Sequence, residues 1–357
     1  MDQQQEYNSY KHLLESKNFT AFLGYPYNFT GAEDILQDFE HSYYTRMTYR
    51  TVILLSLYAP IFLVGLVGNI LIICTVASDK NVRKAKNYYL LNLAAADLMV
   101  TLFCMPMAIT TIIYRLWIYG EFLCKAIVFL QGIAVANSIF TLTAMSIDRY
   151  ISIQHPVTAH RVTSPGQALI IILVIWIVSA IFMGPLLYIR KIDTLEMPEL
   201  TVMQFCIEDW PQDYDRQAFG VFLLFMIYII PGGTLAICYA HVGRTLCSDD
   251  MCRESSDSST KRLFSRKRAA RMLIILVVIF MICWLPYNIT SLSVDIAEES
   301  EPVRLLPFAL WLGHAHSAVN PVMYWLLNRR FRDKVRSMMK YIRRSNMFLS
   351  SPTPDYV

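Results

Sequence analysis

Seven apolar stretches, each long enough to cross a lipid bilayer, constrain this sequence more than any other feature. They lie at about 51–78, 87–115, 121–153, 164–189, 217–246, 268–294 and 304–327. A membrane-spanning helix needs about 20 predominantly apolar residues. A transmembrane β-barrel would instead show short segments of alternating hydrophobicity, which this sequence lacks. The pattern therefore predicts an all-α fold, a seven-transmembrane helix bundle over residues 51–328.

The basic residues outside the spans indicate the orientation of the bundle. With the N-terminus outside the cell, 22 Lys and Arg residues lie on the inner side and ten on the outer side. This distribution follows the positive-inside rule. Two sequons, at Asn18 and Asn28, fall in the tail over 1–50 that this orientation places outside, where glycans are added. We expect a multi-pass protein of the plasma membrane with an extracellular, glycosylated N-terminal tail.

The acidic residues have the opposite distribution, with 19 Asp and Glu residues in the outer segments and eight on the inner side. Acidic residues contribute little to membrane orientation, so topology alone is an insufficient explanation. An acidic extracellular mouth attracts cations. The skew therefore indicates a basic ligand, and the alternative is that it merely accompanies the topology.

Two of the eight cysteines lie in the oxidising compartment that this topology defines. Cys124 lies at the outer end of the third span, and Cys206 lies in the second outer loop. Because disulfides persist in oxidising compartments, we expect these two residues to be bonded. No Cys/His spacing indicates a metal site of the zinc kind.

Strongly polar side chains inside the spans are costly and are therefore candidate functional residues. Asp97 lies in the second span, where a central Asp costs about 2.5–3.5 kcal/mol. A closed bundle could surround it with Asn69, Ser138, Ser317 and Asn320. A carboxylate among neutral oxygens could hold a small cation such as sodium, or a proton. The alternative is a hydrogen-bonded packing contact without an ion.

A charged triplet, Asp148-Arg149-Tyr150, lies at the inner end of the third span. Arg149 could fold back onto Asp148 or swing inward to another partner, as in a two-position switch. The alternative is an arginine that only anchors the helix at the membrane interface. Aromatic residues and helix-bending prolines in the last three spans favour the switch. They are Pro231 and Tyr239, then Phe280, Trp284 and Pro286, and finally Asn320, Pro321 and Tyr324.

Together these motifs resemble those of the rhodopsin-like (class A) G protein-coupled receptors. The resemblance covers about residues 50–342 and touches every span. It rests on Gly68-Asn69, LAAAD ending at Asp97, W-x-x-G-x-x-x-C from Trp117 to Cys124, Asp148-Arg149-Tyr150, Trp176, Pro231 with Tyr239, FxxCWLP from Phe280, and NPxxY from Asn320. Residues 329–342, with Phe331, resemble the family's amphipathic helix on the inner membrane surface, which leaves 343–357 as a cytoplasmic tail.

The resemblance implies that an extracellular ligand shifts an equilibrium between inactive and active bundles. Trp284 and Phe280 would be the pivot, and Pro286 the hinge for an outward swing of the sixth helix. Arg149 would then leave Asp148 and, with the inward-facing tyrosines, help to form the cavity for a heterotrimeric G protein. Arrestin and receptor kinases are further partners that the family implies, and membrane lipid surrounds the spans. Neither nucleic-acid binding nor enzymatic activity is indicated.

Two features depart from the family's pattern. The inner end of the sixth span reads TKRLFSRKRAAR and holds no acid that could clasp Arg149. The contact with Asp148 must then restrain the arginine alone, so we expect measurable basal activity. In addition, His316 stands where the family usually has Asn beside Ser317. This makes a sodium site less secure and adds a group that titrates.

Three residues of the outer half indicate the kind of ligand. Amine receptors carry an Asp where this sequence has Gln131, and no Lys lies in the seventh span, where opsins need one for retinal. Gln131, a Cys-x-Glu-x-Trp pattern containing Glu208, and Asp295 resemble receptors for neuropeptide FF, orexin, neuropeptide Y and RFamide peptides. The resemblance implies a basic, C-terminally amidated neuropeptide. Glu208 and Asp295 would meet its cationic residues, and Gln131 its buried terminus.

Other ligands and other functions remain as alternatives. Glu208 and Asp295 could be solvated loop charges of little energetic effect. A class A receptor for a lipid or small molecule would have an apolar outer pocket in place of an acidic mouth. A transporter or channel is disfavoured because the spans show no inverted repeat and no ring of acidic residues.

Overall fold

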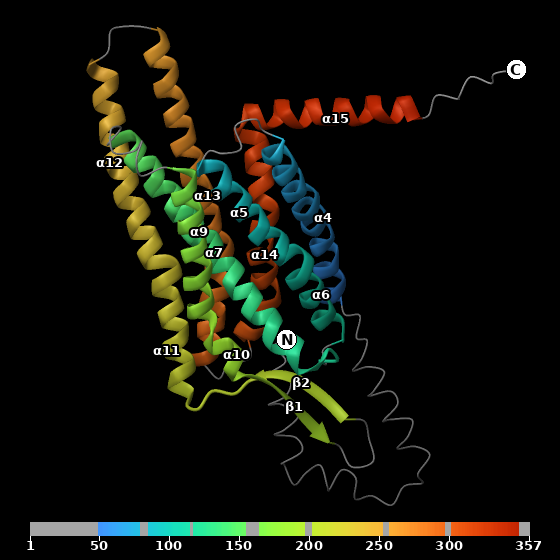
Figure 1. Ribbon diagram of the computed structural model, residues 1–357. Coiled ribbons are helices and arrows are strands. Elements are labelled where there is room, and N and C mark those ends of the chain that lie inside the picture. The colour runs from blue at the N-terminus through green and yellow to red at the C-terminus, as the bar shows by residue number, and fades with distance from the viewer. Residues whose placement is uncertain are drawn as a thin grey trace, which may run out of the picture.

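The computed structural model describes residues 49–78, 85–114, 117–154, 164–196, 202–252, 257–296 and 301–349. Most of these residues are helical. The helices are α4 (Tyr49–Ala77), α5 (Ala85–Met99), α6 (Met105–Tyr114), α7 (Gly120–Gln154), α9 (Pro165–Met183), α10 (Pro185–Ile189), α11 (Asp213–Leu224), α12 (Ile230–Cys252), α13 (Asp257–Ile296), α14 (Glu301–Leu327) and α15 (Arg329–Leu349). Figure 1 shows a bundle of long helices, with α15 lying crosswise at one end and a two-stranded hairpin at the other.

The seven predicted spans are all found as helices. Six segments are long and apolar enough to cross a membrane: Tyr49–Ala77, Ala85–Tyr114, Gly120–Gln154, Pro165–Ile189, Tyr214–Val242 and Ala270–Ser293. The seventh span, α14, is more polar because it contains His314, His316 and Asn320, all of which are buried. Helices suit this environment because their backbone groups are satisfied within the segment.

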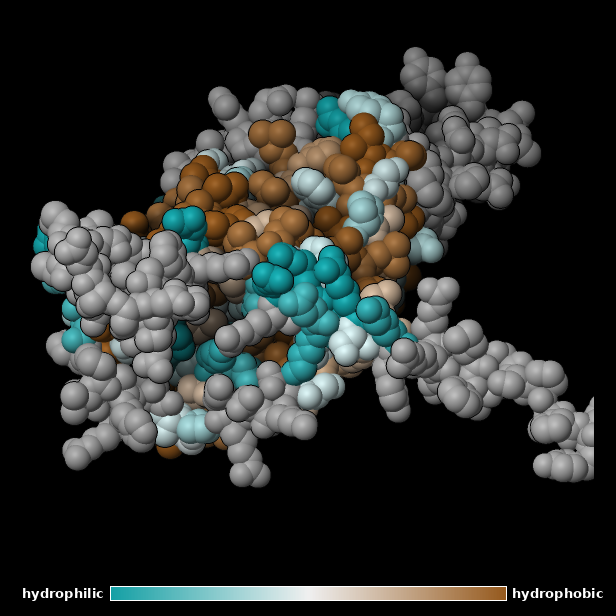
Figure 2. Space-filling view, turned by 90° about the horizontal axis from the view of Figure 1, so that it is seen from above, coloured by the Kyte–Doolittle hydropathy of each residue, from teal (hydrophilic) through white to brown (hydrophobic). Residues whose placement is uncertain are grey.

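The outer surface of the bundle is apolar, as a lipid environment requires. Side chains such as Leu63, Val67, Ile181 and Ile237 are more than half exposed. A soluble protein would rarely leave so many large apolar side chains in contact with water. Seen from the end where α15 begins, hydrophilic surface gathers on the end face, and hydrophobic surface extends along the flank of the bundle (Figure 2).

Two spans contain a π-helical turn shortly before a proline. One turn, Val100–Cys104, precedes Pro106, and the other, Phe225–Ile229, precedes Pro231. Proline cannot donate a backbone hydrogen bond and collides with the preceding turn of an α-helix. A local widening of the helix accommodates that disruption. The proline positions were evident in the sequence, but the π-helical geometry was not predicted.

The hairpin of the second outer loop was also not predicted. Strands β1 (Arg190–Glu196) and β2 (Val202–Glu208) pair antiparallel, and the register places Arg190 opposite Glu208. The predicted disulfide between Cys124 and Cys206 is confirmed and ties β2 to the outer end of α7. The backbone N–H of Trp117 also donates to the carbonyl of Gln204, at 2.8 Å. The hairpin is therefore anchored at two points across the outer end of the bundle.

Helices α4 and α14 approach each other closely where the Gly-Asn motif of one meets the Asn-Pro region of the other. A Cβ atom on Gly68 would lie 2.5 Å from the Pro321 ring, closer than any side chain permits. The next residue, Asn69, donates from Nδ2 to the Ser317 carbonyl oxygen at 2.9 Å. Glycine thus allows the two helices to approach, and asparagine joins them.

The crosswise helix α15 packs against the bundle through its first turns. Phe331 and Val335, one turn apart, are both buried, and the Phe331 ring lies 6.5 Å from that of Tyr324. An amphipathic helix with one buried face suits the membrane surface. It extends beyond the predicted end at residue 342 and reaches Leu349.

Candidate functional site

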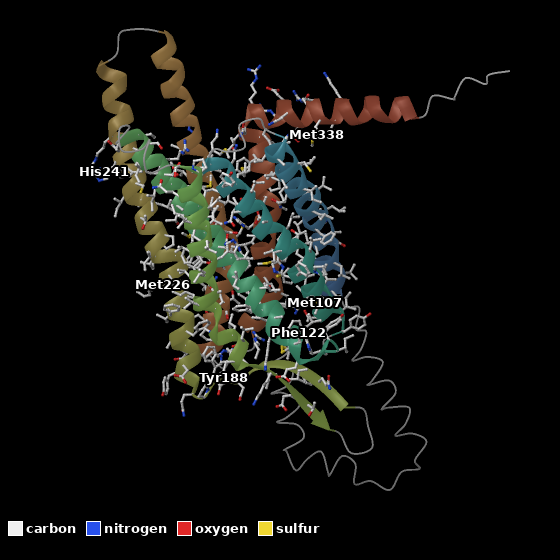
Figure 3. All side chains as sticks on the ribbon, in the orientation of Figure 1. Met107, Phe122, Tyr188, Met226, His241 and Met338 are labelled. Carbon is white, nitrogen blue, oxygen red and sulfur yellow. A yellow bond between two sulfur atoms is a disulfide. The ribbon has the colours of Figure 1, made fainter. Side chains whose placement is uncertain are left out.

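An outer cavity of about 540 Å³ lies between the helices and the hairpin. Its lining includes Met107 and Gln131 from the bundle and Arg190 and Glu208 from the hairpin. A smaller cavity of about 140 Å³ adjoins it and shares Gln131, Arg190 and Glu208. In Figure 3, Met107 lies in the half of the bundle nearest the hairpin, whereas His241 and Met338 lie toward the opposite end. A ligand from the hairpin side would enter this space.

Gln131 lines both cavities and begins a hydrogen-bond chain that crosses the bundle. Its Oε1 atom lies 3.2 Å from Nε2 of His314, whose Nδ1 atom lies 3.1 Å from the hydroxyl oxygen of Tyr58. An amide oxygen only accepts, so Nε2 of His314 donates to it, and in the neutral ring Nδ1 accepts from Tyr58. The chain joins α7, α14 and α4. Neither Tyr58 nor His314 was singled out from the sequence.

Glu208 lines the cavities as predicted, but two arginines already surround its carboxylate. Oε1 lies 2.5 Å from Nη2 of Arg190, and Oε2 lies 3.3 Å from Nε of Arg216. The indole N–H of Trp210 donates to Oε2 at 3.0 Å. Burial favours a higher pKa for Glu208, but the two arginines and the hydrogen bonds hold that pKa below its ordinary value.

This geometry disfavours Glu208 as a direct contact for a cationic ligand. A ligand cation would have to approach a carboxylate that lies between two guanidinium groups, which would repel it. The third predicted ligand residue, Asp295, is in the last turn of α13, and its side chain lies outside the described residues. The sequons at Asn18 and Asn28 also lie outside them.

Two of the four residues predicted to surround Asp97, Asn320 and Ser317, contact its carboxylate and form with it a buried polar centre. The Asp97 carboxylate accepts from Nδ2 of Asn320 at 2.7 Å and is also hydrogen-bonded by Ser317. Nδ1 of His316 lies 3.9 Å from its other oxygen. Asn69 and Ser138 are buried as well. In the described residues, the buried Oδ1 atoms of Asn69 and Asn320 have no hydrogen-bond partner.

Trp284 and Phe280 lie one turn apart in α13, between the outer cavity and the polar centre. The Trp284 ring lies 6.1 Å from that of His314, and the Phe280 ring lies edge-on to His316 at 5.1 Å. A Cβ atom on Gly313 would lie 2.8 Å from the Trp284 ring. Pro286 lies within the same helix, two residues beyond Trp284. Each aromatic ring therefore contacts one of the two histidines in α14.

At the inner end, Arg149 is bonded to Asp148, its neighbour on the same helix. Nη2 of Arg149 lies 2.8 Å from Oδ2 of Asp148. The Tyr239 hydroxyl is 3.0 Å from Oγ of Ser146, and the Tyr150 ring lies 6.0 Å from that of His241. Arg149 thus occupies the first of its two predicted positions, in which it folds back onto Asp148.

The Tyr324 hydroxyl group completes the inner set of predicted residues. The side chain is buried, and its hydroxyl has no hydrogen-bond partner among the described residues. It lies on α14 one turn after Asn320 and Pro321. A buried donor without an acceptor is costly, so another arrangement that supplies one would be favoured.

A further polar cluster was missed in the sequence. Asn92 accepts from the indole N–H of Trp176 at 2.7 Å and donates to Asn137 at 2.7 Å and to Thr141 at 2.8 Å. Asn92 thereby joins α5, α7 and α9, and both the oxygen and the nitrogen of its side-chain amide form hydrogen bonds. Trp176 alone was a signal in the sequence, because a buried indole needs an acceptor.

Comparison with known proteins agrees with this arrangement. Residues 68–324 match the family described as 7 transmembrane receptor (rhodopsin family). The chain belongs to this family. It is therefore a multi-pass membrane receptor and not an enzyme, and its recognition as a rhodopsin-like G protein-coupled receptor is confirmed.

Several individual receptors are similar over most of the chain. A QRFP-like peptide receptor from Branchiostoma floridae is 31% identical over 293 residues, 80% of this chain and 77% of that protein. Galanin receptor 2a from Danio rerio is 31% identical over 299 residues, which are 82% of this chain and 79% of that protein. Neuropeptide FF receptor 2 from Rattus norvegicus is 27% identical over 316 residues, which are 84% of this chain and 75% of that protein.

Proposed function

We propose that this protein is a plasma-membrane receptor, with its N-terminus outside, that is activated by an extracellular neuropeptide and couples to a heterotrimeric G protein. The observation that carries this proposal is the outer cavity beneath the disulfide-anchored hairpin, in a chain whose relatives are receptors named for peptides. A short peptide needs more room than a small amine, and two adjoining cavities supply it.

The ligand remains a basic, C-terminally amidated peptide in this proposal. Asp295 and the acidic outer segments would attract its cationic residues. Gln131 would meet the terminal amide. Because Oε1 of Gln131 accepts from His314, its amino group is what it offers to a ligand, and this group would donate to the amide carbonyl oxygen.

Ligand binding at Gln131 would reach the sixth helix through two contacts. A ligand that pulls on Gln131 alters its bond with His314, and the His314 ring adjoins Trp284. Since Gly313 leaves no free space against the indole, a shift of α14 here displaces Trp284. Pro286 would then act as the hinge that lets the inner end of α13 swing outward.

At the inner face, the swing would free Arg149 for a new partner. The bond to Asp148 joins neighbours on one helix and is partly exposed, so it is easily exchanged. Tyr239 and Tyr324 would join Arg149 in the cavity that receives the G protein. An acceptor for the buried Tyr324 hydroxyl would stabilise that state. Arrestin and receptor kinases would act at the same face.

An allosteric sodium ion is part of the proposal. The Asp97 carboxylate and the unsatisfied Oδ1 atoms of Asn69 and Asn320 supply buried oxygens of the kind a hard cation prefers, and Ser138 and Ser317 would add hydroxyl oxygens. The ion, when bound, would supply a positive charge that offsets the buried carboxylate. His316 competes for the same carboxylate.

A signalling screen tests the proposed function. Cells expressing the chain, and mock-transfected cells, are challenged with a library of amidated neuropeptides while calcium and cyclic AMP are measured. We expect a nanomolar response that weakens strongly in Asp295→Ala and is retained in Arg244→Gln, a change at an exposed side chain near the inner end of α12. If no peptide of the library gives a response, although the receptor is confirmed at the cell surface, a lipid or small-molecule ligand would be favoured instead.

A further inference from the structure

The charged residues that line the outer cavity are mainly basic, although the outer segments as a whole are acidic. The charged residues among the described lining residues are three arginines, Arg50, Arg190 and Arg216, and one acid, Glu208. The local net formal charge is therefore +2, three positive against one negative. The described charged residues of the cavity wall are therefore mainly basic, whereas the outer segments around it carry a net negative charge. A ligand inside the cavity contacts the basic residues of the wall.

Arg190, Glu208 and Arg216 form a compact cluster on the wall shared by both cavities. Arg190 and Glu208 face one another across the hairpin, and Arg216 reaches them from α11. Their side chains are only 18%, 18% and 26% exposed. Among the described lining residues, two guanidinium groups therefore lie against one carboxylate in a partly desolvated place, where water screens charges weakly.

An unsatisfied donor in the cluster points to the missing partner. Nε of Arg190 is buried and has no hydrogen-bond acceptor among the described residues. Buried donors are usually paired, and an orphaned one costs about 1–3 kcal/mol. Gln131, on the same shared wall, also presents a donor, because its oxygen is taken by His314. The shared wall thus offers a buried guanidinium N–H group and an amide N–H group, which complement an anionic acceptor.

We propose that the peptide ligand also carries a carboxylate, which docks against Arg190 and Arg216 while Glu208 remains between them. The geometry suits this group, since a planar guanidinium binds a carboxylate through parallel hydrogen bonds. The inference rests on the proposed peptide function and specifies its ligand further. The carboxylate comes from an Asp or Glu side chain of the amidated peptide, or from a free C-terminus that takes the place of the proposed terminal amide.

Affinity selection on purified receptor in lipid nanodiscs distinguishes these sources. Four libraries of short random peptides are offered separately: with or without Asp and Glu, and each ending in an amide or in a free acid. Bound peptides are recovered and identified by mass spectrometry. We expect the amidated library that lacks Asp and Glu to be retained at least about tenfold less than a library that contains carboxylates.

Each pattern of retention has one interpretation. Retention of amidated peptides only when they contain Asp or Glu supports a side-chain carboxylate. Retention of free-acid peptides without Asp or Glu supports a C-terminal carboxylate. Equal retention of the amidated, acid-free library overturns the inference but leaves a peptide receptor. No retention of any library above empty nanodiscs overturns both the inference and the proposed peptide function.

Variants assign the effect to the cluster. Arg190→Gln and Arg216→Gln should each reduce the preference for carboxylates by about tenfold, whereas Arg244→Gln should leave it unchanged. Because Arg190 also pairs across the hairpin, thermal unfolding of each variant checks that it is folded. Arg216→Glu adds a gain of function: it should shift retention toward peptides rich in Lys. An unchanged preference in folded Arg190→Gln and Arg216→Gln would contradict the assignment.

Discussion

The carboxylate of Asp148 holds the guanidinium of its own neighbour, Arg149, with 2.8 Å between Oδ2 and Nη2. Adjacent residues do not face one another on a helix, so the arginine bends back to make this contact. Its side chain is 32% exposed, whereas that of Asp148 is 9% exposed. The bond therefore restrains Arg149 but not strongly, because water screens one partner.

Replacing Asp148 by Asn should raise signalling in the absence of ligand. The partly exposed ion pair contributes on the order of 1 kcal/mol, so its loss should increase the active population roughly two- to five-fold. Basal G protein activation, measured in cells at matched surface expression, checks this. The wild-type receptor should itself exceed mock-transfected cells, because the basic inner end of α13 offers no second acid for Arg149.

A matched control removes a different carboxylate on the inner side. Asp333 lies on the exposed surface of α15 and pairs loosely with Arg329, at 3.8 Å. Asp333→Asn should leave basal signalling unchanged. Equal basal signalling in the wild type and Asp148→Asn would refute the restraining role of this bond.

Adding one methyl group at Gly68 should destabilise the bundle. Its Cβ atom would lie 2.5 Å from the Pro321 ring, so α4 and α14 must separate. Overpacking of this kind costs about 1–3 kcal/mol. Gly233→Ala is the matched control, because a Cβ atom there meets nothing within 4 Å. Thermal unfolding of the purified receptor should give a lower Tm for Gly68→Ala and an equal or higher Tm for Gly233→Ala. Similar Tm values for both would show that the helices separate at no cost.

The fold was predictable from the sequence because each span is recognisable by itself. Length and apolar character need no knowledge of neighbours, and all seven spans are found as helices. The disulfide was predictable for a similar reason, since the topology left only Cys124 and Cys206 in the oxidising compartment. Asp97 and Asn320 were also recognisable, because polar side chains in lipid must face inward.

Contacts that depend on how elements face one another were not predictable. Arg190 meets Glu208 because of the register of a hairpin that no local signal indicated. His314 reaches Gln131 and Tyr58 because of the rotation of α14 relative to two distant helices. Both are settled by packing across the bundle. Glu208 could thus be placed at the cavity from its motif, whereas its two arginine partners could not be inferred.

Acid should weaken the cluster of Arg190, Glu208 and Arg216 only at low pH. The arginines hold the pKa of Glu208 below its ordinary value of about 4.3, so this group stabilises the folded receptor above that value. The stabilisation is lost as the pH falls through the lowered pKa. Between about pH 7 and 5, the Tm difference between the wild type and Glu208→Gln should stay constant, and below about pH 4 it should shrink.

An exposed carboxylate provides the control for this titration. Glu121 is 61% exposed and pairs with Lys125 one turn away. Glu121→Gln should differ little from the wild type in Tm at any pH, since exposed pairs contribute little. A difference between the wild type and Glu208→Gln that already shrinks between pH 7 and 5 would contradict the lowered pKa.

Sodium should stabilise the purified receptor through Asp97. A ligand that binds only the folded state at tenfold its Kd adds about 1.4 kcal/mol, so Tm should be higher in sodium chloride than in the chloride of a bulky organic cation. Asp97→Asn should abolish the difference. His316→Asn should enlarge it, because the ring that lies 3.9 Å from the carboxylate is replaced by an amide that offers an oxygen. Ser337→Ala, on the exposed surface of α15, should leave it unchanged. Equal Tm values in both salts for the wild type and for His316→Asn would show that the buried oxygens around Asp97 serve packing alone.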